Sequence, residues 1–288
     1  MVNYENFSNG ENPSASDWDM SDVEDFSYSE EEKRSYDIRE RALKENLETL
    51  ASERAGYIFD AGDEFVKNLR QNEHPFTKRI EGNIDDLVTM REDNNRNTLN
   101  AFYDYVDSIY PSPYQKPEDR KPGDAEGDYR RKSVIEGQTT GDNLDELAKS
   151  FSIDGSERDL HIAATLRNMG KETDMYPNEL SNAIIEYTKD PSQNNRANLT
   201  RIQSDYGKVM SKSLFNIAEI FSGSQTNIGK KMFDPTIELM TMLAQSSNEY
   251  FDGLMAYLKF KMENSDAKNV VKPTKTNENQ ILPDVFLQ

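Results

Sequence analysis

The fold is decided by two stretches near the C-terminus: residues 198–221 (NLTRIQSDYGKVMSKSLFNIAEIF) and residues 235–264 (PTIELMTMLAQSSNEYFDGLMAYLKFKMEN). Apolar residues recur in each at intervals of three and four, which places them on one face of an α-helix. An Asp-Pro pair at 190–191 and another at 234–235 are typical of helix starts, and Gly223 is typical of a helix end. The sequence therefore predicts two long helices.

These helices form the predicted C-terminal domain, residues 177–265, together with a shorter helix over 178–189. Three helices make a small antiparallel bundle. Its Met and aromatic residues are interpreted as core rather than as a cofactor pocket. The predicted apolar face of the last helix ends with Tyr257, Leu258 and Lys261. A candidate basic patch for an acidic partner, whose alternative is a merely solvated face, comprises four lysines on the first long helix and the predicted loop after it: Lys208, Lys212, Lys230 and Lys231.

The composition of the whole chain limits its function. Only 35% of the 288 residues are hydrophobic, and they are unevenly spread, so much of the chain is expected to be disordered. The absence of cysteine excludes disulfides and thiolate chemistry. The net charge of −19 opposes direct nucleic-acid binding. No signal peptide or membrane-spanning run is recognised, and an intracellular protein, in the cytoplasm or nucleus, is expected.

The acidic N-terminal tail, residues 1–33, combines negative charge with apolar side chains. Residues 1–32 contain ten Asp or Glu and no Lys or Arg. Such a segment can order on a basic, grooved partner, or it can be an unspecific acidic tail. The candidate partner-binding residues are Trp18, Met20, Val23 and Phe26. Five candidate phosphorylation sites each have an acidic residue three positions later: Ser14, Ser16, Ser21, Ser27 and Ser29.

A helical region is predicted over residues 34–110. Its second half has two apolar blocks separated by a polar centre at Arg91, Asn94 and Thr98. Such a centre can fix the register of an oligomerising coil, or the helix can dock on the preceding one. The candidate oligomerisation residues are Ile80, Ile84, Leu87, Leu99, Phe102, Val106 and Ile109.

Residues 111–143 are predicted to be a Pro-rich linker, because four prolines fall between 111 and 122 and the remainder is polar. Within it, Ser133 follows a basic run at 130–132 and is either a candidate site for a basophilic kinase or part of an ordinary charged linker. Residues 144–176 are predicted to be a helical connector, and residues 266–288 a disordered tail.

No catalytic, metal or cofactor site is predicted. The two histidines, His74 and His161, lie far apart in the sequence. Residues 223–231 have some features of a phosphate-binding loop, but the spacing of the glycines is wrong and no strand precedes them. The densest carboxylate clusters fall in predicted disorder, where no fixed acid and base pair can be held. The chain is therefore expected not to be an enzyme.

The order of these parts resembles the phosphoproteins of non-segmented negative-strand RNA viruses, especially rhabdoviruses. The likeness is one of organisation over the whole chain: an acidic N-terminus at 17–32, a central helical element at 80–109, a linker and a C-terminal helical domain. The resemblance implies a non-catalytic polymerase cofactor that keeps nucleoprotein free of RNA and tethers the large polymerase protein to the nucleoprotein–RNA template. It also implies self-association, an intracellular location in an infected host and presence in the virion.

Two other classes of protein fit the same composition. An acidic helical scaffold or virion assembly protein would also lack cysteine and self-associate. An acidic adaptor or activator of cellular origin would use residues 18–26 on a transcription or trafficking partner. The partner distinguishes these classes, because only the polymerase cofactor should bind a basic RNA-binding protein through residues 1–32.

Overall fold

The structure, a computed structural model, describes residues 29–71, 73–115, 123–153, 155–222 and 227–265. None of these residues is in a strand. They form long helices in the following order: α1 (Glu30–Gln71), α2 (Thr77–Ile109), α3 (Ala125–Ser152), α4 (Glu157–Lys189), α5 (Gln193–Ser222) and α6 (Asn227–Asn264). The prediction of a mainly α protein is confirmed.

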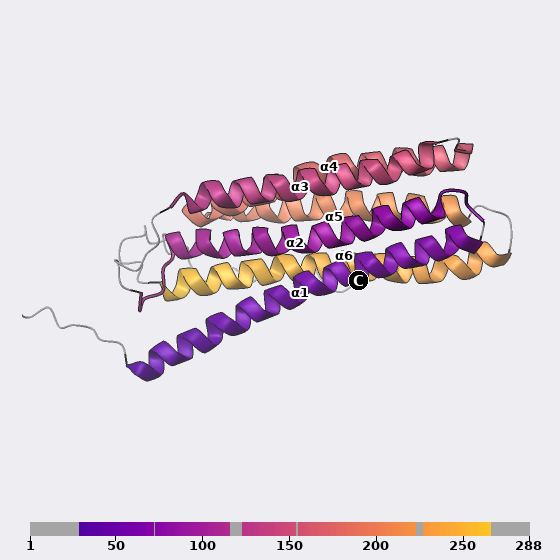
Figure 1. The fold of residues 1–288 in the computed structure, drawn as a ribbon. Helices are drawn as coiled ribbons and strands as arrows, with labels where there is room; N and C mark the ends of the chain where they lie inside the picture. Colours follow the sequence, from indigo (N-terminus) through magenta and orange to yellow (C-terminus); the bar gives the residue numbers. More distant parts are fainter. Residues whose placement is uncertain (1–28, 72, 116–122, 154, 223–226, 266–288) are drawn as a thin grey trace, which may run out of the picture.

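The helices form one elongated bundle (Figure 1). Each packs against the next in the chain, and α6 returns to pack against α1, which closes a ring. The α3–α4 pair forms one side of the bundle and the α1–α6 pair the other, with α2 and α5 between them. The α1 helix runs obliquely, and its first turns protrude beyond the end of the bundle.

Local sequence explains where two of the helices begin. At α1 the Ser29 N–H donates to the Glu32 carboxylate at 2.8 Å, and the Glu32 N–H donates to the Ser29 hydroxyl at 3.2 Å. Ser156 and Asp159 make the same reciprocal pair at the start of α4. Each pair satisfies backbone N–H groups that a helix N-terminus leaves unpaired, and its acidic member complements the helix dipole.

The apolar core is divided into two clusters along the bundle. The larger cluster draws on all six helices, with members such as Leu47, Phe102 and Leu199. The smaller one lies where the α1–α2 and α3–α4 connections pack together, and it includes Ile80 and Phe151. Along α2, α3 and α4, the residues that lie in sequence between the two clusters are largely polar, so a polar layer lies between the clusters, with Met210 packed against both.

Close packing of α3 against α4 depends on glycine. A Cβ atom at Gly137 would lie 2.2 Å from the Asp174 carbonyl oxygen, and one at Gly141 would lie 3.0 Å from the Gly170 carbonyl oxygen. Glycine in a helix interior costs stability through its flexibility. Here it lets two backbones approach, which explains why a glycine-containing, polar stretch forms a well-packed helix.

This helix corrects the predicted linker over residues 111–143. From Ala125 onward the chain is the buried α3, whose packed face carries small and polar side chains such as Ser133, Gly137 and Thr140. Counting large apolar residues does not detect such a face. The prolines at 117 and 122 lie outside the described residues.

The predicted boundary at Pro177 is also wrong, because α4 runs through it as a single helix. A proline inside a helix removes one backbone hydrogen bond. Tyr176 and Leu180 on either side are buried in the larger cluster and hold the helix together. Residues 177–265 are therefore part of one bundle with residues 30–176 rather than a separate domain. The last helix also begins earlier than predicted, at Asn227 instead of near residue 235.

Candidate functional site

The polar layer encloses a cavity of about 40 Å³ that is lined by side chains from all six helices. We call it the central cavity. Its charged lining residues are Arg54 from α1, Arg91 from α2 and Glu136 from α3, which are 7%, 7% and 9% exposed. The other polar lining residues are Thr98, Tyr129, Ser133, Thr140, Thr173, Tyr176, Tyr206 and Tyr250.

Charge in the central cavity is not balanced. Two guanidinium groups face one carboxylate, and among the described residues no carboxylate lies within 4.0 Å of either arginine. The Nε atoms of Arg54 and Arg91 and the hydroxyl of Thr98 are buried without a hydrogen-bond partner. Burial and the neighbouring Arg54 charge lower the pKa of Arg91. An arginine nevertheless remains protonated at neutral pH.

Tyrosines supply most of the remaining polar groups. The rings of Tyr176 and Tyr206 stack with their centroids 3.7 Å apart, and the Tyr176 hydroxyl donates to Gln203. The Arg54 guanidinium lies 5.7 Å from the centre of the Tyr250 ring. Burial raises the pKa of Tyr129, Tyr176 and Tyr250, so these side chains are neutral at physiological pH. They therefore carry no negative charge that could neutralise the arginines.

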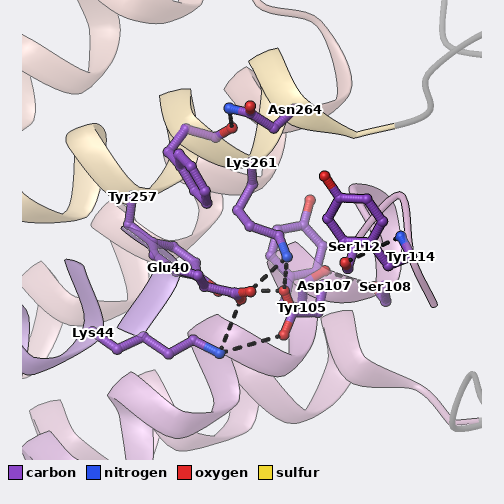
Figure 2. A network of polar contacts seen from close by, with 11 residues as sticks. Glu40, Lys44, Tyr105, Asp107, Ser108, Ser112, Tyr114, Tyr257, Lys261 and Asn264 are labelled. Atoms are coloured by element: carbon purple, nitrogen blue, oxygen red, sulfur yellow. Dashed lines mark hydrogen bonds and ion pairs between the residues drawn. The ribbon is translucent and has the colours of Figure 1, made fainter. Parts of the chain in front are cut away.

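A second buried polar cluster, which we call the Lys261 network, joins α1, α2 and α6 (Figure 2). Lys261 is 1% exposed, and its Nζ lies 2.7 Å from Asp107 Oδ1 and 3.2 Å from Glu40 Oε1. The Tyr257 hydroxyl lies 3.1 Å from Glu40 Oε1 and 3.3 Å from Asp107 Oδ1. Lys44 approaches Glu40 at 3.2 Å and Asp107 at 3.8 Å. Two carboxylates thus meet two ammonium groups.

The pKa shifts in the Lys261 network agree with this pairing. Burial alone would lower the pKa of Lys261, but the Asp107 carboxylate outweighs it and the pKa is raised. Burial would raise the pKa of Glu40, but the ammonium groups of Lys261 and Lys44 outweigh it and the pKa is lowered. Both groups are therefore held in their charged forms. The charges of the network are balanced within the chain, as expected of a structural contact.

The candidate oligomerisation residues are not on a free surface. Six of them are buried inside the single chain, Ile80, Ile84 and Leu87 in the smaller cluster and Leu99, Phe102 and Val106 in the larger; the seventh, Ile109, is half-buried against the larger cluster. This corrects the interpretation of the α2 stripe as a contact between copies. The stripe packs against α1, α3 and α6 because the bundle offers those faces within the same chain.

The candidate partner-binding residues Trp18, Met20, Val23 and Phe26 lie outside the described residues, as do Ser14, Ser16, Ser21 and Ser27. Ser29 is exposed and caps α1. Ser133 is 1% exposed, and its hydroxyl donates to the Tyr129 carbonyl. A kinase cannot reach Ser133 in this fold, so the structure contradicts the prediction of a phosphorylation site there.

The four lysines of the candidate basic patch are distributed over two helices. Lys208 and Lys212 are exposed on α5, and Lys208 forms an ion pair with Asp205 at 3.5 Å. Lys230 and Lys231 belong to the first turns of α6 rather than to a loop, and their side chains lie outside the description. The structure therefore places half of the patch on one exposed surface.

Sequence reasoning singled out Arg91 and Thr98 as a polar interruption but did not find Arg54 or Glu136. Charged residues are rarely buried, so a single Arg or Glu in a helix gives no signal of a buried site.

Within the described ranges, no group of three or more His, Asp or Glu side chains is placed to hold a metal ion. None of the helices in the described ranges combines the length and the apolar character that crossing a membrane requires. Comparisons of the chain with protein-family models, curated proteins and solved structures find no significant match.

Proposed function

We propose that this chain is a non-catalytic protein-binding factor that captures a basic RNA-binding protein through its acidic N-terminal segment. For a viral chain, the proposed role is that of a polymerase cofactor. It keeps nucleoprotein free of RNA and tethers the large polymerase protein to the nucleoprotein–RNA template. The observation that carries it is the distribution of charge. Residues 1–29 hold seven Asp or Glu and no Lys or Arg.

The position of this segment supports the proposal. It joins the bundle at the capped start of α1, where Glu30, Glu31 and Glu32 are exposed and continue the negative charge. That end of α1 protrudes from the bundle (Figure 1). An acidic segment with apolar side chains can compete with RNA for a basic groove. The bundle then serves as a rigid body from which the segment extends.

The burial of the α2 stripe within one chain removes the sequence argument for self-association through residues 80–109. The alternative of a self-assembling scaffold therefore has no support from that stripe.

Affinity capture from cells that naturally make the protein, followed by mass spectrometry with and without nuclease, tests the proposal. The bait proteins are the full chain and a chain that begins at Ser29, which keeps the α1 cap intact. A basic RNA-binding protein should be recovered with the full chain, independently of nuclease, and lost with the shorter chain. Equal recovery by both would contradict the proposal, and a shell protein alone would favour the scaffold.

Point variants locate the contact. A Trp18→Ala/Phe26→Ala chain should lose the partner, whereas Tyr4→Ala/Phe7→Ala, which removes two aromatic rings from the same segment, should retain it. A Lys208→Glu/Lys212→Glu chain tests whether the exposed half of the basic patch binds the large polymerase protein or the template. The variant should recover less of that partner than the unmodified chain does. Lys259→Glu is its matched control, because the Lys259 and Lys208 side chains are equally exposed.

A further inference from the structure

We infer that the central cavity binds one small inorganic anion, of the size of a halide or a tetrahedral oxyanion. The inference is independent of the proposed function, because the cavity is lined by residues of the helices and the proposed function uses the acidic N-terminal segment. It rests on three observations: an excess of positive charge, buried donors without acceptors, and a cavity of matching size.

The first observation is the excess of positive charge in the cavity. Arg54 and Arg91 place two guanidinium groups beside a single carboxylate, Glu136, that is too far away to form an ion pair with either. An unpaired buried charge is strongly unfavourable, and water can solvate it but cannot neutralise it. An anion between the two arginines would balance the charge.

The second observation is that three buried donors without an acceptor belong to residues that line the cavity. The Nε–H groups of Arg54 and Arg91 have no acceptor among the described residues. The Thr98 hydroxyl is likewise buried without a partner, and the Tyr206 and Tyr250 side chains also line the cavity. Charge-assisted hydrogen bonds from guanidinium to an anion are among the strongest in proteins.

The size of the cavity selects the class of ligand. A volume of about 40 Å³ is room for about three water molecules, or for one small anion. A nucleotide or an organic acid as large as gluconate would not fit. Because the lining comes from all six helices, an anion held here would stabilise the whole bundle.

Thermal unfolding of the full chain at constant ionic strength tests the inference. Sodium gluconate, whose anion is too large for the cavity, is the reference, and chloride, bromide, sulfate and phosphate are the probes. At least one small anion should raise Tm saturably, by about 5 °C at high occupancy. The anion dependence should vanish in Arg91→Met and Arg54→Met and persist in Arg201→Met, which removes an exposed arginine. A rise that is equal in all four proteins would overturn the inference.

Glu136→Gln provides a test that does not remove an arginine. Loss of the carboxylate increases the excess positive charge, so the anion should bind about tenfold more tightly. Unchanged or weaker binding would count against the site even if the arginine variants failed to fold. In crystals grown in the anion that raises Tm most, density for that anion, with an anomalous peak if it is bromide, should lie between the two guanidinium groups. Ordered water alone at that position would overturn the inference.

Discussion

The central cavity and the Lys261 network are both buried polar clusters, yet they differ in how their charge is balanced. In the network, Lys261 and Lys44 face Glu40 and Asp107 at distances of 4.0 Å or less. In the cavity, two arginines face one more distant carboxylate. A cluster that is complete within the chain holds helices in register, whereas an incomplete one is suited to a ligand. The predictions below test this contrast.

The largest effect is expected from Lys261→Met. The substitution leaves the carboxylates of Glu40 and Asp107 with only the half-exposed Lys44, and breaking a buried pair in this way costs about 3 kcal/mol of unfolding free energy. Denaturant unfolding monitored by circular dichroism measures it.

Lys44→Met is the matched control, because it removes an ammonium group from the same two carboxylates. Its side chain is 30% exposed, and partly solvated ion pairs contribute about 1 kcal/mol or less. Equal costs for the two variants would mean that burial of Lys261 does not set the strength of the network.

The next effect is a loss of stability at high pH. Burial raises the pKa of Tyr105, which stacks on Tyr129 of the cavity lining, to about 12. An unfolded tyrosine ionises near pH 10, so the folded state keeps a proton that the unfolded state loses. Stability due to Tyr105 is therefore complete below pH 10 and falls by about 2 kcal/mol as the pH rises to 12.

Tyr105→Phe should reduce this alkaline loss, and the half-exposed Tyr57→Phe should not. In the Lys261 network, burial and the carboxylates of Asp107 and Glu40 raise the pKa of Tyr257, so Tyr257→Phe should behave as Tyr105→Phe does. Unfolding midpoints measured from pH 8 to 12 check both. A flat pH profile in the unmodified chain would contradict the assignment of neutral, buried tyrosines to both clusters.

A smaller effect is expected from Arg91→Met. In a buffer without small anions the substitution removes an uncompensated charge and fills the same space, so the free energy of unfolding should fall by less than about 1 kcal/mol, if it falls at all. This is well below the cost of Lys261→Met, although both side chains are buried. A loss of about 3 kcal/mol would show that the chain itself compensates Arg91, and the contrast between the clusters would fail.

Much of the fold could be predicted from sequence wherever large apolar residues carry the buried face. The stripe through Leu199, Ile202 and Tyr206 is buried in α5 as predicted, and Lys261 was placed on the apolar face of α6, where the structure has it buried. Periodicity does not say which helices share a core. The two apolar blocks of α2 therefore fitted either a second copy or the preceding helix, and the faces that cover them lie in the same chain.

The central cavity was harder to predict, because periodicity within one helix does not show which other helices pack against it. Arg91 and Thr98 stood out as a polar break between apolar blocks, but their counterpart Glu136 lies in a stretch that was interpreted as a linker. That stretch is helical because glycine and hydroxyl side chains allow α3 to approach α4 closely, and this depends on three-dimensional contacts that a propensity scale does not contain. A charged site assembled from helices far apart in the chain becomes visible only once they are packed.

The smallest effect is expected on the stability of the fold at acidic pH. Because Lys261 and Lys44 lower the pKa of Glu40 below its ordinary value, the folded state releases a proton that the unfolded state still binds. The stability that results is present above pH 4.5 and is lost as the pH falls through the folded-state pKa. Glu40→Gln should therefore flatten the acid limb of the stability profile, while Glu48→Gln, an exposed position on the same helix, should leave it unchanged. If both variants gave the acid limb of the unmodified chain, Glu40 would not be held by the two lysines in solution, and the Lys261 network would be no more complete than the cavity.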